Sequence, residues 1–278
     1  MSQPNCNENI FFKISLTEWS LHKSLEKGEI TNLDFPRIAR NRYNIDAIEY
    51  VSVFFHDKAD DKAYLQQLKD SCNKYNVTGL LIMVENEGNI SSTDQAERHI
   101  AVKNHFKWIR AASFLGCHSI RVCLQDQGCK NTVKKAAIDG LSILCDYAEL
   151  FSINIIVENQ IGYAADSEWF SDIIRMVNKP NCGTFPDFGF FGTNCKRKEI
   201  EKLMSFAKSI NGKSFDFDDS GNETTFDFIK MLNLIKSLNY NGYIDIDYHG
   251  NRLTEDDGIM ATKQLLLKAG QCLEAKMN

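Results

Sequence analysis

The sequence predicts an α/β protein that folds as a single (β/α)8 TIM barrel. Eight short runs rich in β-branched residues recur along the chain, and a longer stretch with helical spacing of apolar residues follows each run. The 278 residues suffice for a barrel, which takes about 200–250 residues as one unit. Only four prolines occur, which leaves no Pro-rich linker. We therefore expect one domain over residues 1–278, with residues 1–10 as a flexible tail.

The strands and helices are expected in strict alternation. The predicted strands are residues 12–16, 47–54, 79–84, 119–124, 154–158, 183–187, 206–210 and 243–248. Helices are clearest at 93–115, where an apolar face is predicted to include Ile100 and Ile109 and Gly116 to end the helix, and at 131–151. Thr254 and Asp257 resemble a capping box before the last helix.

Alternation of this kind gives a parallel sheet, which can close into a barrel or stay open and doubly wound. An open dinucleotide-binding sheet would carry G-x-G-x-x-G after its first strand, whereas residues 16–22 read LTEWSLH. The closed barrel is therefore the prediction.

Composition narrows the classes of function. The formal charge of -5 and a pI near 5.7 argue against a nucleic-acid partner, and no apolar run is long enough for a membrane span. Nine scattered cysteines contain no C-x-x-C pair and are typical of reduced thiols. We expect a cytoplasmic protein.

Polar residues end the last four predicted strands. They are Glu158, Asp187, Asn211 and Asp247. A carboxylate that follows a run such as Ile-Ile-Val costs several kcal/mol to bury unless it binds a metal or a hydrogen-bonding ligand. Any one of them alone could be an acid bonded to a neighbouring loop, but four at consecutive strand ends predict a site, because barrel chemistry sits at the rim where strands finish.

Further residues are candidates for substrate binding at this rim. Trp19 offers an aromatic face for a sugar, or packs in the core, and His22 and Glu49 could line the same wall. Lys213 could hold a phosphate or polarise a carbonyl, and His249, which shares strand parity with Asp247, could supply a base or a ligand. Solvated positions are the alternative for these last two residues. The two acids beyond strand three, Glu85 and Glu87, are expected in a solvated loop.

At these residues the chain resembles the sugar phosphate isomerase/epimerase family, a branch of the xylose-isomerase-like barrels. The resemblance runs nearly end to end. Its most specific stretches are residues 14–22 (ISLTEWSLH), 115–122 (LGCHSIRV), 157–159 (VEN), 213–223 (KSFDFDDSGNE), 242–250 (GYIDIDYHG) and 258–263 (GIMATK).

The resemblance implies a metal site and a proton-transfer pair. In the family a Glu, an Asp, a His and a second Glu from strands five to eight usually hold a divalent metal, and the two glutamates move the proton next to the sugar carbonyl. Glu158 and Asp187 match the first two, whereas Asn211 stands in place of the His and Asp247 in place of the second Glu. Gln160 and Phe190 also replace polar or basic family residues.

The implied function is isomerisation or epimerisation of a sugar, sugar phosphate or polyol, with Glu158 and Asp247 as the catalytic pair. An all-oxygen ligand set favours Mn or Mg over Zn. Several alternatives stay open: a sugar-binding barrel without catalysis or metal, a related lyase or dehydratase, and an abasic-site endonuclease. Relatives often form dimers or tetramers, so a homo-oligomer is open as well.

Overall fold

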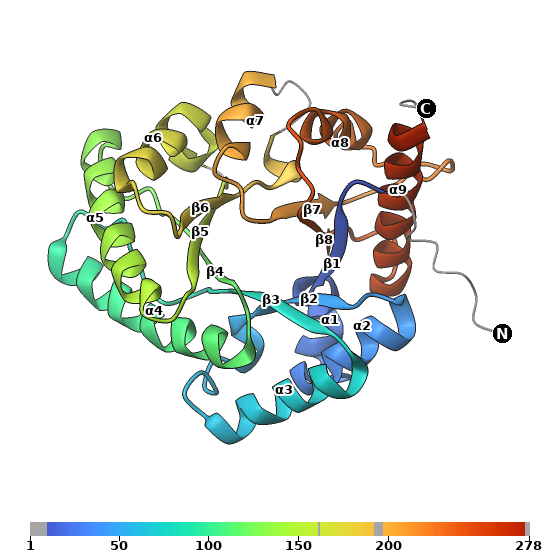
Figure 1. Ribbon diagram of the computed structural model, residues 1–278, viewed down its shortest axis with the longest axis horizontal. Coiled ribbons are helices and arrows are strands. Elements are labelled where there is room, and N and C mark those ends of the chain that lie inside the picture. The colour runs from blue at the N-terminus through green and yellow to red at the C-terminus, as the bar shows by residue number, and fades with distance from the viewer. Residues whose placement is uncertain (1–9, 161, 192–196, 276–278) are drawn as a thin grey trace.

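The computed structural model describes residues 10–160, 162–191 and 197–275. Parallel strands form an inner ring and helices surround it (Figure 1). The strands are β1 Lys13–Thr17, β2 Ala47–Val51, β3 Thr78–Met83, β4 Ser119–Val122, β5 Asn154–Glu158, β6 Cys182–Phe185, β7 Ile210–Ser214 and β8 Tyr243–Tyr248. The helices are α1 His22–Glu26, α2 Phe35–Tyr43, α3 Lys62–Tyr75, α4 Gln95–Leu115, α5 Lys130–Glu149, α6 Ser167–Val177, α7 Arg197–Met204, α8 Phe228–Ser237 and α9 Glu255–Ala275. The predicted barrel is confirmed.

The strands lie in the order β6-β5-β4-β3-β2-β1-β8-β7, and all of the paired neighbours run parallel. The ring closes between β6 and β7 through two isolated parallel bridges, Thr184 with Ala207 and Asp187 with Asn211. Closure therefore brings the ends of β5 to β8 to one part of the rim.

Local sequence explains where the helices begin and end. Asp94 caps α4 by accepting the N–H of Glu97, and Gly116 ends it at φ 82°, a left-handed backbone that favours glycine. Thr254 Oγ1 accepts the N–H of Asp257 at the head of α9, as the capping pattern predicts. The predicted apolar face of α4 is wrong at Ile100, which is 61% exposed, because α4 turns small residues and Trp108 toward the sheet.

One predicted strand is displaced. The seventh was expected at residues 206–210, but β7 is Ile210–Ser214, since it pairs with β8 in register from Ile210 opposite Ile244 to Ser214 opposite Tyr248. Residues before it make only bridging contacts with β6. Lys213 thus lies inside the strand, directly beside Asp247.

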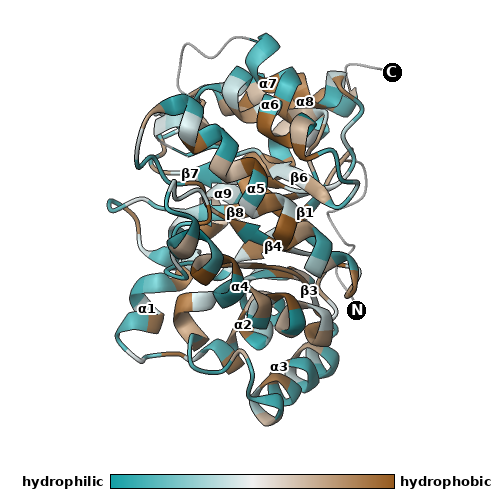
Figure 2. Cartoon of the chain, turned by 90° about the vertical axis from the view of Figure 1, so that its left-hand side faces the viewer, coloured by the Kyte–Doolittle hydropathy of each residue, from teal (hydrophilic) through white to brown (hydrophobic). Residues whose placement is uncertain are grey.

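The main core fills the space between the sheet and the helices, and hydrophilic and hydrophobic residues alternate along the helices (Figure 2). A second apolar cluster lies within the ring. It consists of Val51, Leu81, Met83, Ile156 and Phe185.

No helix in the described ranges is long and apolar enough to cross a membrane. The predicted tail lies, apart from Ile10, outside the described residues, and the seven cysteines described are all free thiols.

Candidate functional site

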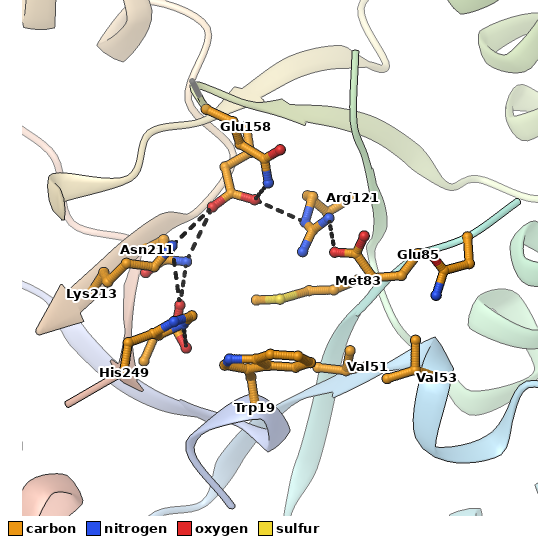
Figure 3. A pocket seen from close by; sticks show the side chains of 13 residues that line it. Trp19, Val51, Val53, Met83, Glu85, Arg121, Glu158, Asn211, Lys213 and His249 are labelled. Carbon is orange, nitrogen blue, oxygen red and sulfur yellow. Dashed lines mark hydrogen bonds and ion pairs between the residues drawn. The ribbon is translucent and has the colours of Figure 1, made fainter. Parts of the chain in front are cut away.

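A pocket of about 320 Å³ opens at the end of the ring where the strands finish. Trp19 forms one wall, with Val51, Val53 and Met83 beside it, and a polar wall faces them (Figure 3). The polar lining consists of Glu85, Asn86, Arg121, Glu158, Gln160, Asn211, Lys213, Asp247 and His249. One apolar aromatic wall opposite many hydrogen-bonding groups suits a small polyhydroxylated ligand.

Lys213 occupies the centre of the polar wall. Its ammonium lies 2.5 Å from Asp187 Oδ2, 3.7 Å from Glu158 Oε1 and 3.8 Å from Asp247 Oδ2. The three carboxylates raise the pKa of Lys213 above its ordinary value, although burial acts in the opposite direction. The lysine is therefore charged, and it draws together acids from three strand ends.

Glu158, the last residue of β5, is almost fully buried and lies between two cations. Arg121 Nε is 3.2 Å from its Oε2, on the side away from Lys213, and Gln160 donates a hydrogen bond to the same oxygen at 3.0 Å. Burial raises the pKa of Glu158, but Arg121 and Lys213 outweigh it and hold the pKa below its ordinary value. The side chain is an ionised carboxylate at neutral pH.

Asp247 works together with His249 on the other side of Lys213. His249 Nε2 lies 2.9 Å from Asp247 Oδ1, and Asn211 Nδ2 donates to Asp247 Oδ2 at 2.9 Å. Burial of Asp247 acts to raise its pKa, but His249, Lys213 and Asn211 hold the pKa well below its ordinary value. Because Nε2 faces the aspartate, Nδ1 is the ring nitrogen of His249 that Asp247 does not hold.

The four residues predicted as metal ligands do come together, but their arrangement does not fit a divalent cation. Asn211 turns its amide N–H toward Asp247 and, at 3.5 Å, toward Glu158 Oε1, whereas a ligand must offer a lone pair. The Lys213 ammonium lies among the three acids. Within the described ranges no group of three or more His, Cys, Asp or Glu residues could hold a metal.

The predicted substrate-binding residues divide into two groups. Trp19, Lys213 and His249 line the pocket. His22 does not, because it stacks behind Trp19 at 5.0 Å and its Nδ1 bonds to Trp19 O at 2.8 Å. Glu49 is fully buried deeper in the ring, where it accepts a hydrogen bond from Ser15 at 2.9 Å.

Glu49 forms a carboxyl pair with Asp245. Burial raises the pKa of Glu49 to about 7, and burial together with the neighbouring Glu49 raises that of Asp245. Glu49 Oε2 and Asp245 Oδ2 have no N–H or hydroxyl donor among the described residues, so a proton held between the two carboxyl groups satisfies both. The two residues lie beneath the pocket and do not line it.

The expected solvated positions of Glu85 and Glu87 need correction, because each acid has a specific partner. Arg121, inside β4, binds Glu85 Oε1 at 2.6 Å, so Glu85 lines the pocket and is not simply solvated. Glu87 accepts the indole N–H of Trp108 at 2.7 Å and pairs with Lys107. One feature of the sequence could have identified Arg121 as a functional residue: it is a charged residue among the apolar residues of a buried strand.

Solved structures of similar fold include enzymes that act on sugars. A D-tagatose 3-epimerase-like protein superposes with a TM-score of 0.76 at 19% identity, covering 96% of this chain and 100% of its own. A D-allulose 3-epimerase from Methylomonas sp. gives 0.73 at 15%, covering 97% and 100%. An IOLI protein with a bound zinc atom gives 0.76 at 15%, covering 94% and 99%. At these identities the likeness shows the fold alone.

Comparison with curated proteins gave no match. The family model for the xylose isomerase-like TIM barrel matches residues 39–269, which is most of the chain and includes every residue of the polar wall. The chain therefore belongs to the xylose isomerase-like TIM barrel family.

Proposed function

We propose that this protein is a sugar isomerase or epimerase that moves a proton at the carbon next to the carbonyl of a ketose, aldose or related polyol. The observation that carries the proposal is the pair of ionised strand-end carboxylates, Glu158 and Asp247, on either side of one buried ammonium in a pocket walled by Trp19. Proton abstraction beside a carbonyl needs a base at the carbon and positive charge at the oxygen. This polar wall offers both.

Each group has a role in that reaction. Glu158 takes or returns the proton on one side of the sugar. On the other side Asp247 orients His249. Asp247 is one methylene shorter than the glutamate that the resemblance implies, and the imidazole of His249 extends toward the sugar in its place. Lys213 and Arg121 stabilise the negative charge that develops on the carbonyl oxygen.

Asn211 fits a role in binding. Its Oδ1 is buried and has no donor among the described residues, while its Nδ2 is bonded to Asp247. An unsatisfied buried oxygen in a pocket costs about 1–3 kcal/mol, which a sugar hydroxyl can recover by donating to it.

The test is exchange of substrate hydrogen with solvent. The protein is incubated in D2O with a panel of ketoses, aldoses and polyols, and NMR follows deuterium at the carbon next to the carbonyl. We expect deuterium in at least one sugar together with its isomer or epimer. Glu158→Gln should lower the rate by on the order of 10²-fold or more, whereas Glu149→Gln, an exposed acid on α5, should leave it unchanged.

A sugar-binding barrel without turnover is the second candidate. It is favoured by the cations on both sides of Glu158, which make its carboxylate a weaker base. In that case sugars raise the melting temperature but no deuterium enters any of them, and the proposal of an isomerase is contradicted.

A further inference from the structure

We propose that in this chain the side-chain ammonium of Lys213 takes the place of the divalent metal that the sequence resemblance implies, so that the pocket works with a cation supplied by the protein. The proposal concerns which ion holds the acids together. It rests on the fold and the cluster and would stand even if no sugar were turned over.

The first support is the position of the ammonium. Glu158, Asp187 and Asp247 are the three acids that the sequence resemblance predicts as metal ligands, and Lys213 Nζ is within 4 Å of a carboxylate oxygen of each. A metal at the centre of these acids and the ammonium would occupy the same space. Three buried carboxylates repel one another, and the ammonium between them reduces that repulsion.

The second support is the orientation of Asn211. Its Nδ2 faces Asp247 at 2.9 Å and Glu158 at 3.5 Å, so it adds donors to a set of acids. Reversing the amide would bring Oδ1 against two carboxylate oxygens. Donors around carboxylates complement an ammonium, whereas a divalent ion needs a further acceptor at this position.

The third support is the space built around the lysine stem. A Cβ on Gly189 would lie 3.1 Å from Lys213 Cδ and 3.2 Å from Cγ, so the glycine leaves room for the stem. Gly189 N–H also donates to Asp187 Oδ1 at 2.7 Å, which turns Oδ2 toward Lys213. The turn after β6 thus positions both members of the ion pair.

The fourth support is Phe190, at a position where the sequence resemblance implies a polar residue. Its ring centroid lies 4.6 Å from Lys213 Nζ. An aromatic face attracts an ammonium through a cation–π contact but offers no lone pair to a hard divalent ion. The replacements at 190 and 211 therefore have the same explanation.

Two protein cations flank Glu158. Lys213 lies on one side, and Arg121, which also pairs with Glu85, lies on the other. Fixing two long side chains costs conformational entropy. This cost is reduced because the stems of Arg121 and Lys213 are already held by burial in strands β4 and β7.

The experiment measures metal binding by the full chain. After dialysis against EDTA, the protein is titrated with MnCl2 to millimolar concentration in a calorimeter, and its melting temperature is recorded with and without Mn²⁺. We expect no binding heat and no shift in melting temperature. Binding of one Mn²⁺ per chain that Asp187→Asn abolishes would overturn the proposal.

A pair of variants tests the cause. Asn211→His combined with Lys213→Met introduces an imidazole and removes the ammonium, and we expect this double variant to give a Mn²⁺ binding heat in the range where the wild type gives none. Lys103→Met, an exposed lysine on α4, is the matched control and should behave as the wild type. A folded double variant that binds no Mn²⁺ contradicts the proposal, and if it does not fold, the wild-type titration decides.

Discussion

Lys213 is the residue on which the electrostatics of the site depend, because it contacts acids from β5, from the turn after β6 and from β8. Asp247 lies opposite Lys213 on the adjacent strand. Gly189 leaves room for the lysine stem, and the ring of Phe190 lies against the lysine ammonium. A single long side chain can therefore connect three strand ends that would otherwise repel one another.

A pH-dependent stability is expected from the buried carboxyl pair below the pocket. Glu49 has a pKa of about 7 in the folded chain against an ordinary value of 4.5. Between these values the folded state keeps a proton that the unfolded state has released, so stability falls as pH rises through this window. Asp247 has the opposite effect on the pH dependence of stability. Because its pKa is lowered in the folded chain, it stabilises the fold at pH values above the ordinary aspartate pKa, and this stabilisation is lost in acid.

Glu49→Gln should remove the contribution of this carboxyl, since an amide has no proton to release and can still accept from Ser15 and donate to Asp245. The free energy of unfolding, measured with urea at about pH 5 and about pH 8, should then drop less with pH than in the wild type, by on the order of 2 kcal/mol. Glu149→Gln serves as the control. An unchanged pH slope in Glu49→Gln would contradict the assignment.

At the level of elements, the sequence predicted most of the rim. The strands that carry Glu158 and Asp247 were expected at their observed bounds, because long β-branched runs ended by polar residues locate them well. β7 was displaced because its sequence, INGKS, has little β-branched character and is fixed by pairing with β8. The arrangement of Lys213 among the acids therefore required the tertiary register.

Gly212 is the position in β7 where this register is most sensitive. A Cβ there would lie 2.4 Å from the backbone oxygen of Asp245 and 2.9 Å from Ile244 Cγ2. Gly212→Ala should push β7 away from β8 and cost about 1–3 kcal/mol of unfolding free energy in urea. It should also weaken the contact of Lys213 with Asp247. Wild-type stability in this variant would show that the two strands tolerate the added methyl.

For the whole molecule, alternation of strands and helices predicted the closed ring, and the ring explains why residues far apart in sequence meet. The sequence did not identify Arg121, and it wrongly predicted a solvated Glu85, because a charge inside a strand shows no partner in the sequence and the neighbouring strand brings the two together. The sequence predicts His22 and Glu49 at the rim because they lie near the ends of the first two strands. In the structure the turn after β1 stacks His22 against Trp19, and Glu49 is fully buried within β2.

If this barrel moves a proton on a sugar with Lys213 in place of a metal, the exchange needs no added metal ion. The most direct test is the deuterium exchange assay on a sugar that the panel identifies, run with excess EDTA and then with added Mn²⁺. We expect the same rate of exchange in both conditions. Loss of exchange in EDTA and its return with Mn²⁺ would contradict a role for Lys213 in place of a metal.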